Sequence, residues 1–301
     1  MRMDPFAGPG NGYGGERTDV RRTKDGRPYV YDFEKGKEAA FTRVSTFIDC
    51  LEDKSLLARW GERMTLLGLK QEKDLRSRLM KVDVETLDDK ELRNTLNALV
   101  SEAKEVAGTR DAAHLGTDLH GLAETLDRGE ELPDVPEELA DDIEVYRKTI
   151  ERYRLRPVDI ERFVVLDDLR AAGTLDRIYE WQPNPDADPI RVVGDVKTGR
   201  IDYGQGKLAM QLAMYSRGAG YDPSKPQERV DTEVDQDVGL IIHLPAGQGF
   251  ARVHRVDLNI GWQGVLLAQQ VRAFRALSAR GLLEDIGLEF DLEDTLSAME
   301  G

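Results

Sequence analysis

Apolar residues recur at helical spacing through most of the first half of the chain. The segment from Val44 to Leu69 carries them every three or four positions, which predicts one or two helices with Ser45 or Thr46 as the cap. The same spacing predicts helices over about 88–106, 109–128 and 137–154. Gly129 is expected to end the 109–128 helix in a left-handed conformation.

The pattern changes at Pro157, where short runs rich in Val and Ile are bounded by turn residues. The runs ERFVVLDD, GTLDRIYEW and IRVVGDVKTG predict three strands. A helix is then expected over 203–218, followed by a hairpin that turns at Pro245–Gly249 and a final amphipathic helix over Ile260–Arg280. This order predicts an α/β sandwich with a mixed sheet.

Length and composition suit one core with extensions. We expect a flexible arm and lead-in over 1–40, in which residues 1–28 are rich in Gly, Pro and Arg. A helical elaboration over 41–110, an α/β core over 111–280 and an acidic tail over 281–301 are expected to follow. Because no apolar run approaches about 20 residues and residues 1–15 lack a secretory apolar segment, we expect a cytoplasmic protein without membrane spans.

The net charge of −15 argues against a polyanionic partner if it is spread evenly. It is not even, because the tail 281–301 holds seven acids and no Lys or Arg. The tail is either a DNA mimic that folds over a groove or a solvated extension. A basic stretch is either part of a DNA groove or a solvated helix face; it comprises Arg147, Lys148, Arg152, Arg154 and Arg156.

Two carboxylates and a lysine are expected to converge on the sheet. Strand periodicity places Asp195 and Lys197 on one face, about 7 Å apart. Asp176 lies on the preceding predicted strand, and the Pro-rich turn QPNPDADP would let the two strands pair as a hairpin. A surface salt bridge would explain an isolated Asp-x-Lys. Two carboxylates beside a lysine also suit a hard divalent cation that acts on a phosphodiester.

The surrounding motifs favour the second interpretation. GTLDRI, VVGDVKTG and QLAMY follow one another in an order that resembles the signature of the RecB-like branch of the PD-(D/E)XK nuclease superfamily. Upstream, GTDLHGLAE resembles the first motif of that branch. The resemblance covers roughly residues 40–280 and implies a restriction-endonuclease-like core, in which helices flank a mixed central sheet.

The resemblance also implies roles for individual residues. Asp176, Asp195, the Val196 carbonyl and His120 would hold metal, and Lys197 would orient the attacking water and stabilise the transition state. Gln211 and Tyr215 share a helix face and would position the DNA strand. Two acids are further candidates, Glu124 as a support for His120 and Glu161 ahead of Asp176; His114, His243 and His254 lack such context.

The implied activity is hydrolysis of DNA from its ends with one or two Mg²⁺ or Mn²⁺ ions, in recombination, repair or phage DNA processing. An endonuclease or an RNA- or structure-specific nuclease on the same site remains an alternative, as does a non-catalytic module that binds DNA ends. Cys50 is the only cysteine, so we expect no iron–sulfur cluster. GQGKL at Gly204–Leu208 lacks the Ser or Thr of a Walker A loop, so any translocation would need a partner protein.

Overall fold

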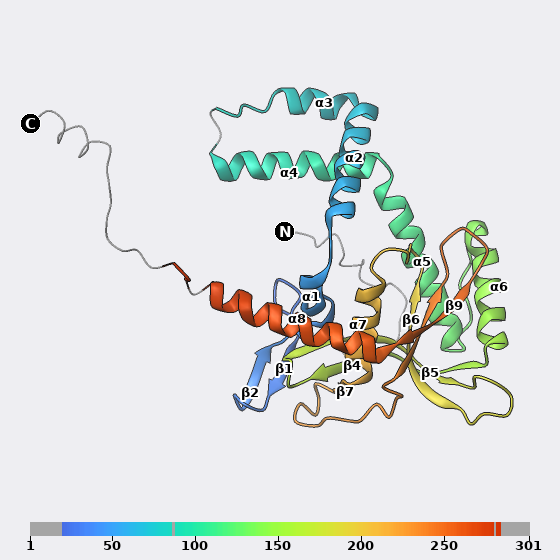
Figure 1. Cartoon of the computed structure of the whole chain (residues 1–301). Helices are drawn as coiled ribbons and strands as arrows, with labels where there is room; N and C mark the ends of the chain where they lie inside the picture. The colour runs from blue at the N-terminus through green and yellow to red at the C-terminus, as the bar shows by residue number, and fades with distance from the viewer. Residues whose placement is uncertain (1–19, 86–87, 280, 284–301) are drawn as a thin grey trace, which may run out of the picture.

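A mixed β-sheet of seven strands forms the centre of this α/β protein (Figure 1). The computed structural model describes residues 20–85, 88–279 and 281–283. A separate two-stranded hairpin precedes the sheet in the chain. The strands are β1 (Tyr29–Asp32), β2 (Lys37–Ala40), β3 (Thr42–Arg43), β4 (Leu155–Leu166), β5 (Ala171–Trp181), β6 (Ile190–Lys197), β7 (Ala219–Gly220), β8 (Val238–His243) and β9 (Arg252–Asp257).

Most helices of the described chain precede the large strands. The helices are α1 (Val44–Ile48), the 3₁₀ turn η1 (Asp49–Leu51), α2 (Ser55–Gln71), α3 (Lys73–Met80), α4 (Asp89–Val106), α5 (Thr109–Asp127), α6 (Glu137–Arg152), α7 (Gln205–Ser216) and α8 (Leu258–Ser278). None of those in the described part of the chain is both long and apolar enough to cross a lipid bilayer.

In the strand order β7-β4-β5-β6-β8-β9, the strands β4 to β6, and β8 and β9, are neighbours both in the chain and in the sheet. From β6 the chain runs through α7 to β7 at the edge beside β4, and then returns to β8 beside β6. β4, β5 and β6 pair antiparallel in sequence order, and β8 pairs antiparallel with β9. β6 and β8 are parallel, and helix α7 lies in the connection between them, as parallel pairing requires a crossover. The short strand β3 adds a parallel contact to β5.

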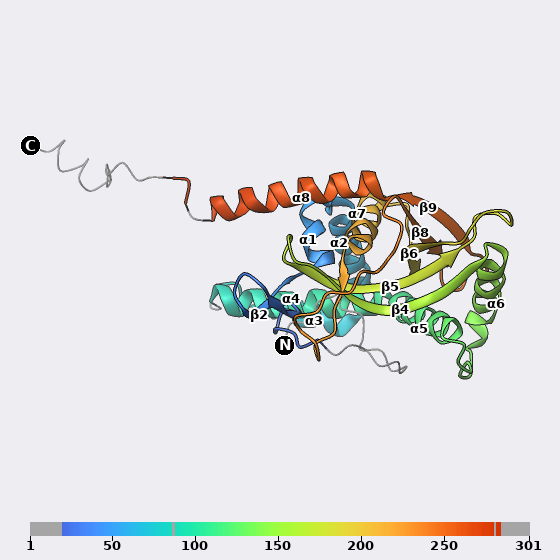
Figure 2. The same ribbon diagram turned by 90° about the horizontal axis from the view of Figure 1, so that it is seen from below.

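Helices cover both faces of the sheet, as Figure 2 shows. Side-chain alternation along the strands directs Val193 and Ile241 into one core with α1, α7 and α8. Val192 and Ile242 point the other way, into a second core with α5 and α6. Because β6 is covered on both faces, its middle reads as a continuous buried run rather than an alternating one.

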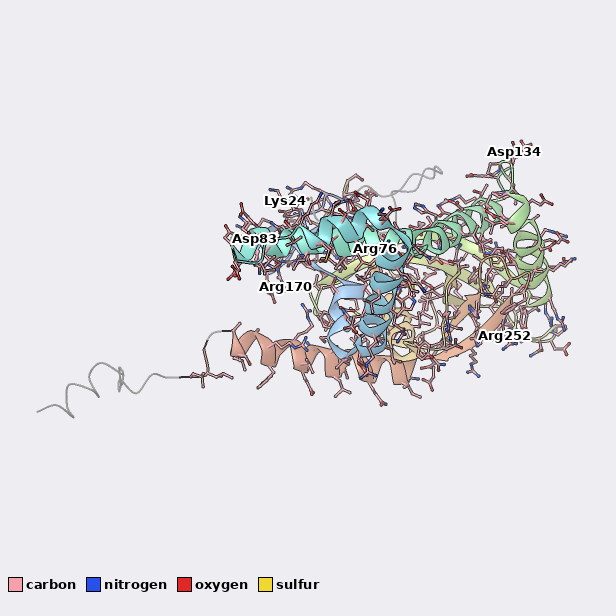
Figure 3. The ribbon with its side chains drawn as sticks, turned by 90° about the horizontal axis from the view of Figure 1, so that it is seen from above. Lys24, Arg76, Asp83, Asp134, Arg170 and Arg252 are labelled. Atoms are coloured by element: carbon pink, nitrogen blue, oxygen red, sulfur yellow. The ribbon has the colours of Figure 1, made fainter. Side chains whose placement is uncertain are left out.

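Helices α2, α3 and α4 form a lobe that stands away from the sheet (Figure 1). In Figure 3 this lobe carries Arg76 and Asp83, while Asp134 marks the link between α5 and α6 on the other side of the molecule. α2 crosses α4 so closely that a Cβ at Gly68 would overlap the backbone of Ala103. The lobe has its own small core, formed by Leu75, Leu99 and Ala103.

The structure confirms an α/β protein with a mixed sheet and a helical N-terminal region. The helices expected over 88–106, 109–128 and 137–154 are α4, α5 and α6, and Gly129 has the left-handed φ of 68°. The expected hairpin at 245–249 joins β8 to β9.

Short elements escaped the sequence pattern. Helix α3 and strands β3 and β7 are too brief to show a period. Within 1–40, expected as an arm and lead-in, β1 and β2 form a hairpin whose Val30 packs with Phe163 of the sheet. Residues 1–19 and 284–301, which include most of the predicted acidic tail, lie outside the described residues.

Candidate active site

Strands β5 and β6 separate at Asp176, and its side chain fills the gap between them. Regular pairing ends at Arg177 opposite Gly194. Beyond that point Oδ2 of Asp176 accepts the Val196 N–H at 2.8 Å, so a carboxylate replaces a backbone carbonyl in the ladder. Leu175 and Ile178 both lie in the first core, which shows that the alternation of β5 is broken between them. Because of this break, the Asp176 carboxylate is directed toward β6, where it accepts the Val196 N–H.

The neighbouring strand β4 is irregular at the same level. Glu161 has φ 56° and lies between the registered pairs Ile160–Arg177 and Arg162–Leu175, opposite Asp176. A left-handed conformation at a residue other than glycine costs about 1–3 kcal/mol and is retained where the surrounding structure enforces it. Glu161, a further candidate from the sequence, is therefore a mid-strand residue of β4 opposite Asp176.

Asp195 and Lys197 project from one face of β6, as strand periodicity predicted. Nζ of Lys197 lies 2.6 Å from Oδ2 of Asp195. Burial raises the pKa of Asp195, and the Asp176 carboxylate raises it further against the opposing effect of Lys197. Burial would lower the pKa of Lys197, but Asp195 outweighs it and raises that pKa. Lys197 is thus held as a cation beside Asp195.

Helix α5 brings His120 to Asp176. Nε2 of His120 lies 3.3 Å from Oδ1 of Asp176, and the carboxylate raises the pKa of His120 although burial opposes the rise. Glu124, one helical turn later, binds Arg128 with two hydrogen bonds. The support that was a candidate role of Glu124 is therefore not seen, and the partner of His120 is Asp176 itself.

A buried arginine next to Asp176 is the main site residue that sequence reasoning missed. Arg177 is fully buried; its Nε donates to Oδ2 of Asp127 at 2.7 Å, and its Nη1 donates to the carbonyl oxygen of Asp176 at 2.9 Å and to its carboxylate. Tyr146 also donates to Asp127, at 2.7 Å. The available signal was an Asp-Arg pair inside an apolar strand, because a charged pair there must find buried partners.

Arg177 changes the electrostatics of Asp176. Burial alone would raise the pKa of Asp176, but Arg177 and His120 outweigh it and hold that pKa far below its usual range. Asp176 is therefore ionised, in contrast to the raised pKa of Asp195. Each of the three buried carboxylates, Asp127, Asp176 and Asp195, has a basic side chain as its partner: Arg177 contacts Asp127 and Asp176, His120 contacts Asp176, and Lys197 contacts Asp195. These pairings reduce the cost of burying three carboxylates close together.

Helix α7 supports the site from the side of Asp195. Nε2 of Gln211 lies 3.5 Å from Oδ1 of Asp195, and Gln211 also hydrogen-bonds Tyr215 on the same helix face. Tyr215 is buried, which raises its pKa, and a Cβ at Gly173 would come within 3.1 Å of its hydroxyl. Tyr215 is thus connected to the site through Gln211. It positions Gln211 and does not itself contact Asp195.

The remaining residues that the sequence analysis named either lie outside this cluster or already bind another group of the protein. Val196 is buried in the second core and contributes its N–H to Asp176. His243 binds the Gly199 carbonyl at 3.0 Å, and His114 is exposed. Arg147 and Lys148 pair with Glu144, and Arg156 pairs with Glu180. These pairs favour a solvated face over a DNA groove for that basic stretch.

The cluster offers the donor types that a hard divalent cation prefers. Asp176 and Asp195 supply carboxylates and His120 an imidazole, and the buried Oδ2 of Asp195 receives no hydrogen bond of good geometry despite its ion pair with Lys197. In the conformation described, no group of three or more His, Cys, Asp or Glu side chains within residues 20–85, 88–279 and 281–283 is placed to hold a metal ion. The donor atoms are of the type that binds a metal. In the conformation described, His120 pairs with the Asp176 carboxylate and Lys197 pairs with that of Asp195.

The comparisons with known proteins give no family assignment. No protein-family model matches the chain, and no curated protein matches it either.

Proposed function

We propose that this protein is a metal-dependent deoxyribonuclease, with the restriction-endonuclease-like core of the RecB-like branch of the PD-(D/E)XK superfamily. One observation carries the proposal: four separate elements bring two groups of contacts together. His120 contacts Asp176, Lys197 and Gln211 contact Asp195, and the backbone N–H of Val196 between Asp195 and Lys197 joins the two groups by donating to Asp176. Perturbed pKa values from burial and specific charge partners are typical of functional sites.

Asp176, Asp195 and His120 would hold Mg²⁺ or Mn²⁺, together with the Val196 carbonyl. When bound, the metal supplies a water of lowered pKa and neutralises charge on the phosphate oxygens. Lys197, kept protonated by Asp195, orients the attacking water and stabilises negative charge that develops on phosphorus oxygens. Arg177 keeps Asp176 ionised and fixed, and Gln211 holds Asp195.

Action on DNA ends, in recombination, repair or phage DNA processing, is our preferred form of the activity. An endonuclease or an RNA- or structure-specific nuclease would use the same residues. A non-catalytic module that binds DNA ends is the alternative from another class, and the presence of Asp176, Asp195 and Lys197 together argues against it. A recombination or replication protein would be the natural partner.

The test is digestion of end-labelled linear single- and double-stranded DNA beside a covalently closed circle, with Mg²⁺, Mn²⁺ or EDTA. Lys197→Ala is the active-site variant. Lys148→Ala, which removes an exposed lysine paired with Glu144, is the matched control.

We expect metal-dependent loss of linear DNA that Lys197→Ala abolishes and Lys148→Ala leaves unchanged. Cleavage of the closed circle would replace the exonuclease with an endonuclease at the same site. Intact DNA under every condition, with DNA still bound, would refute catalysis and leave the binding module.

A further inference from the structure

A large groove opens beside the candidate active site. It has a volume of about 1010 Å³ and lies between the region from α1 to the first half of α2 and the segment 200–207 that leads into α7. Pockets for small molecules usually measure about 300–1,000 Å³, so this groove has room for more than one small ligand.

Two residues that line the groove lie close in the chain to residues of the catalytic cluster. Lys207 lines it, and Gln211 lies one helical turn further along α7 with its amide 3.5 Å from Asp195. Arg200 also lines the groove, three residues after Lys197 in the chain. The groove and the catalytic cluster are therefore linked through α7, by Lys207 on the groove side and Gln211 on the cluster side.

Exposed rings contribute to both walls. Trp60 of α2 is 42% exposed, and Tyr203 of the segment 200–207 is 63% exposed. Leu56 and Leu57 extend the apolar surface of α2 along the same wall. Helices in proteins are stabilised mainly by packing an apolar face, yet the only buried residues of α2 are Gly61 and Gly68. The apolar side chains of α2 that line the groove are therefore exposed, and a ligand could cover them.

Cations line the groove together with these rings. The single carboxylate of Asp49 serves both Lys54 and Lys207, the latter at 2.9 Å, which leaves one positive charge in excess. Arg63 is exposed and makes no ion pair with another residue in the described part of the chain. The guanidinium of Arg200 lies over the Tyr203 ring, 5.3 Å from its centroid, and 3.2 Å from Asp202. Glu52 and Asp53 also line the groove and limit its net charge.

We infer that the groove binds single-stranded DNA and guides it to the catalytic cluster, with Trp60 and Tyr203 as platforms for stacked bases. Rings together with cations suit unpaired bases on a phosphate backbone. Bases inside a duplex already stack on one another and cannot offer their faces to side chains, so a duplex would gain nothing from the rings. The inference deepens the proposed nuclease function by naming its substrate as a single strand, and it rests on that function.

The experiment measures binding without catalysis. Labelled oligo(dT) of about 15 nucleotides, and a blunt duplex of equal length, are titrated in EDTA with the full chain and followed by fluorescence anisotropy. The variants are Trp60→Ala, Tyr203→Ala and Asp49→Asn. Tyr153→Ala is the matched control, because Tyr153 is also 42% exposed but lies at the end of α6, outside the groove. Circular dichroism checks that each variant is folded.

We expect Trp60→Ala and Tyr203→Ala each to weaken oligo(dT) binding on the order of 10-fold, with little effect on the duplex. Asp49→Asn should strengthen binding, since it frees Lys54 and Lys207 for phosphate, and Tyr153→Ala should change nothing. Absence of oligo(dT) binding, or equal binding by the chain and both ring variants, would overturn the inference; in that case a protein partner becomes the occupant to seek.

The two proposals fail in different ways. If Lys197-dependent digestion is present while both ring variants bind normally, only the groove assignment is wrong. If the ring variants lose oligo(dT) binding while no condition gives digestion, the groove binds a single strand and the nuclease function is wrong.

Discussion

Among single residues, Arg177 is a fully buried cation with two carboxylate partners, Asp127 and Asp176. Arg177→Met would leave the buried Asp127 without a counter-charge, because Arg177 and Asp127 are both fully buried and 2.7 Å apart. Asp176 would lose one of its two basic partners and keep His120. Removal of one partner from a buried ion pair typically costs about 3–5 kcal/mol. We expect a loss of that size in the free energy of unfolding, measured with urea.

Arg156→Met is the matched control for this substitution. Arg156 pairs with Glu180 at 2.6 Å but is largely exposed, and exposed pairs contribute about 0–1 kcal/mol. Equal losses in the two variants would show that Arg177 does not carry the buried network. Arg177→Met with Asp127→Leu should recover part of the stability, since both charges are then gone.

His120 makes stability depend on pH. Its folded-state pKa is raised, chiefly by Asp176 and against burial. A raised pKa means that the ion pair stabilises the fold fully below the unfolded pKa of about 6.5, and that this contribution is lost as pH rises through the folded pKa. We expect the melting temperature of the metal-free chain to fall across that window more than that of His120→Gln. His114→Gln, at an exposed position, should behave as the unaltered chain, and parallel pH curves for all three would contradict the assignment.

At the scale of elements, the approach of α2 to α4 depends on Gly68. A Cβ at this position would overlap the carbonyl of Ala103, and that carbonyl belongs to backbone that cannot move aside as a side chain can. Gly68→Ala should therefore destabilise the lobe by about 1–3 kcal/mol, despite the better helix propensity of alanine. Limited proteolysis should show earlier cleavage within α2–α4.

Gly206→Ala gives the comparison for this prediction. Gly206 lies inside α7, where nothing approaches an added Cβ within 4 Å. The substitution should raise the free energy of unfolding by roughly 0.4–1 kcal/mol, because alanine restricts the unfolded chain and favours the helix. A stabilising Gly68→Ala would show that the two helices are further apart than described.

For the whole molecule, metal binding should stabilise the fold. A cation that binds only the folded chain adds RT ln(1 + [L]/Kd), about 2.7 kcal/mol at 100 times Kd. Mn²⁺ should stabilise at least as well as Mg²⁺, because imidazole from His120 suits the softer ion better. Differential scanning calorimetry of the chain and of Asp195→Asn tests this. Equal shifts in both proteins, or a strict preference for Mg²⁺, would remove Asp195 or His120 from the ligand set.

Patterns within one element were predictable from the sequence. Helices α4, α5 and α6 show long apolar periods, and Asp88 caps α4; both signals depend only on neighbouring residues. Asp195 and Lys197 are two positions apart in a strand, so their shared face follows from the pleat alone. The link from His120 to Asp176 required a family resemblance, because no spacing joins an α5 residue to a β5 residue.

The sequence by itself thus determined the α/β class, the main helices and the shared strand face of Asp195 and Lys197. Only the tertiary structure decided that Arg177 would bury its charge against Asp127, and that Trp60 and Tyr203 would share a groove. The same holds for the β1–β2 hairpin, whose Val30 is buried by Phe163 of the sheet. These contacts join segments far apart in the chain, and their free energy comes from burial and charge pairing that exist only after the chain has closed upon itself.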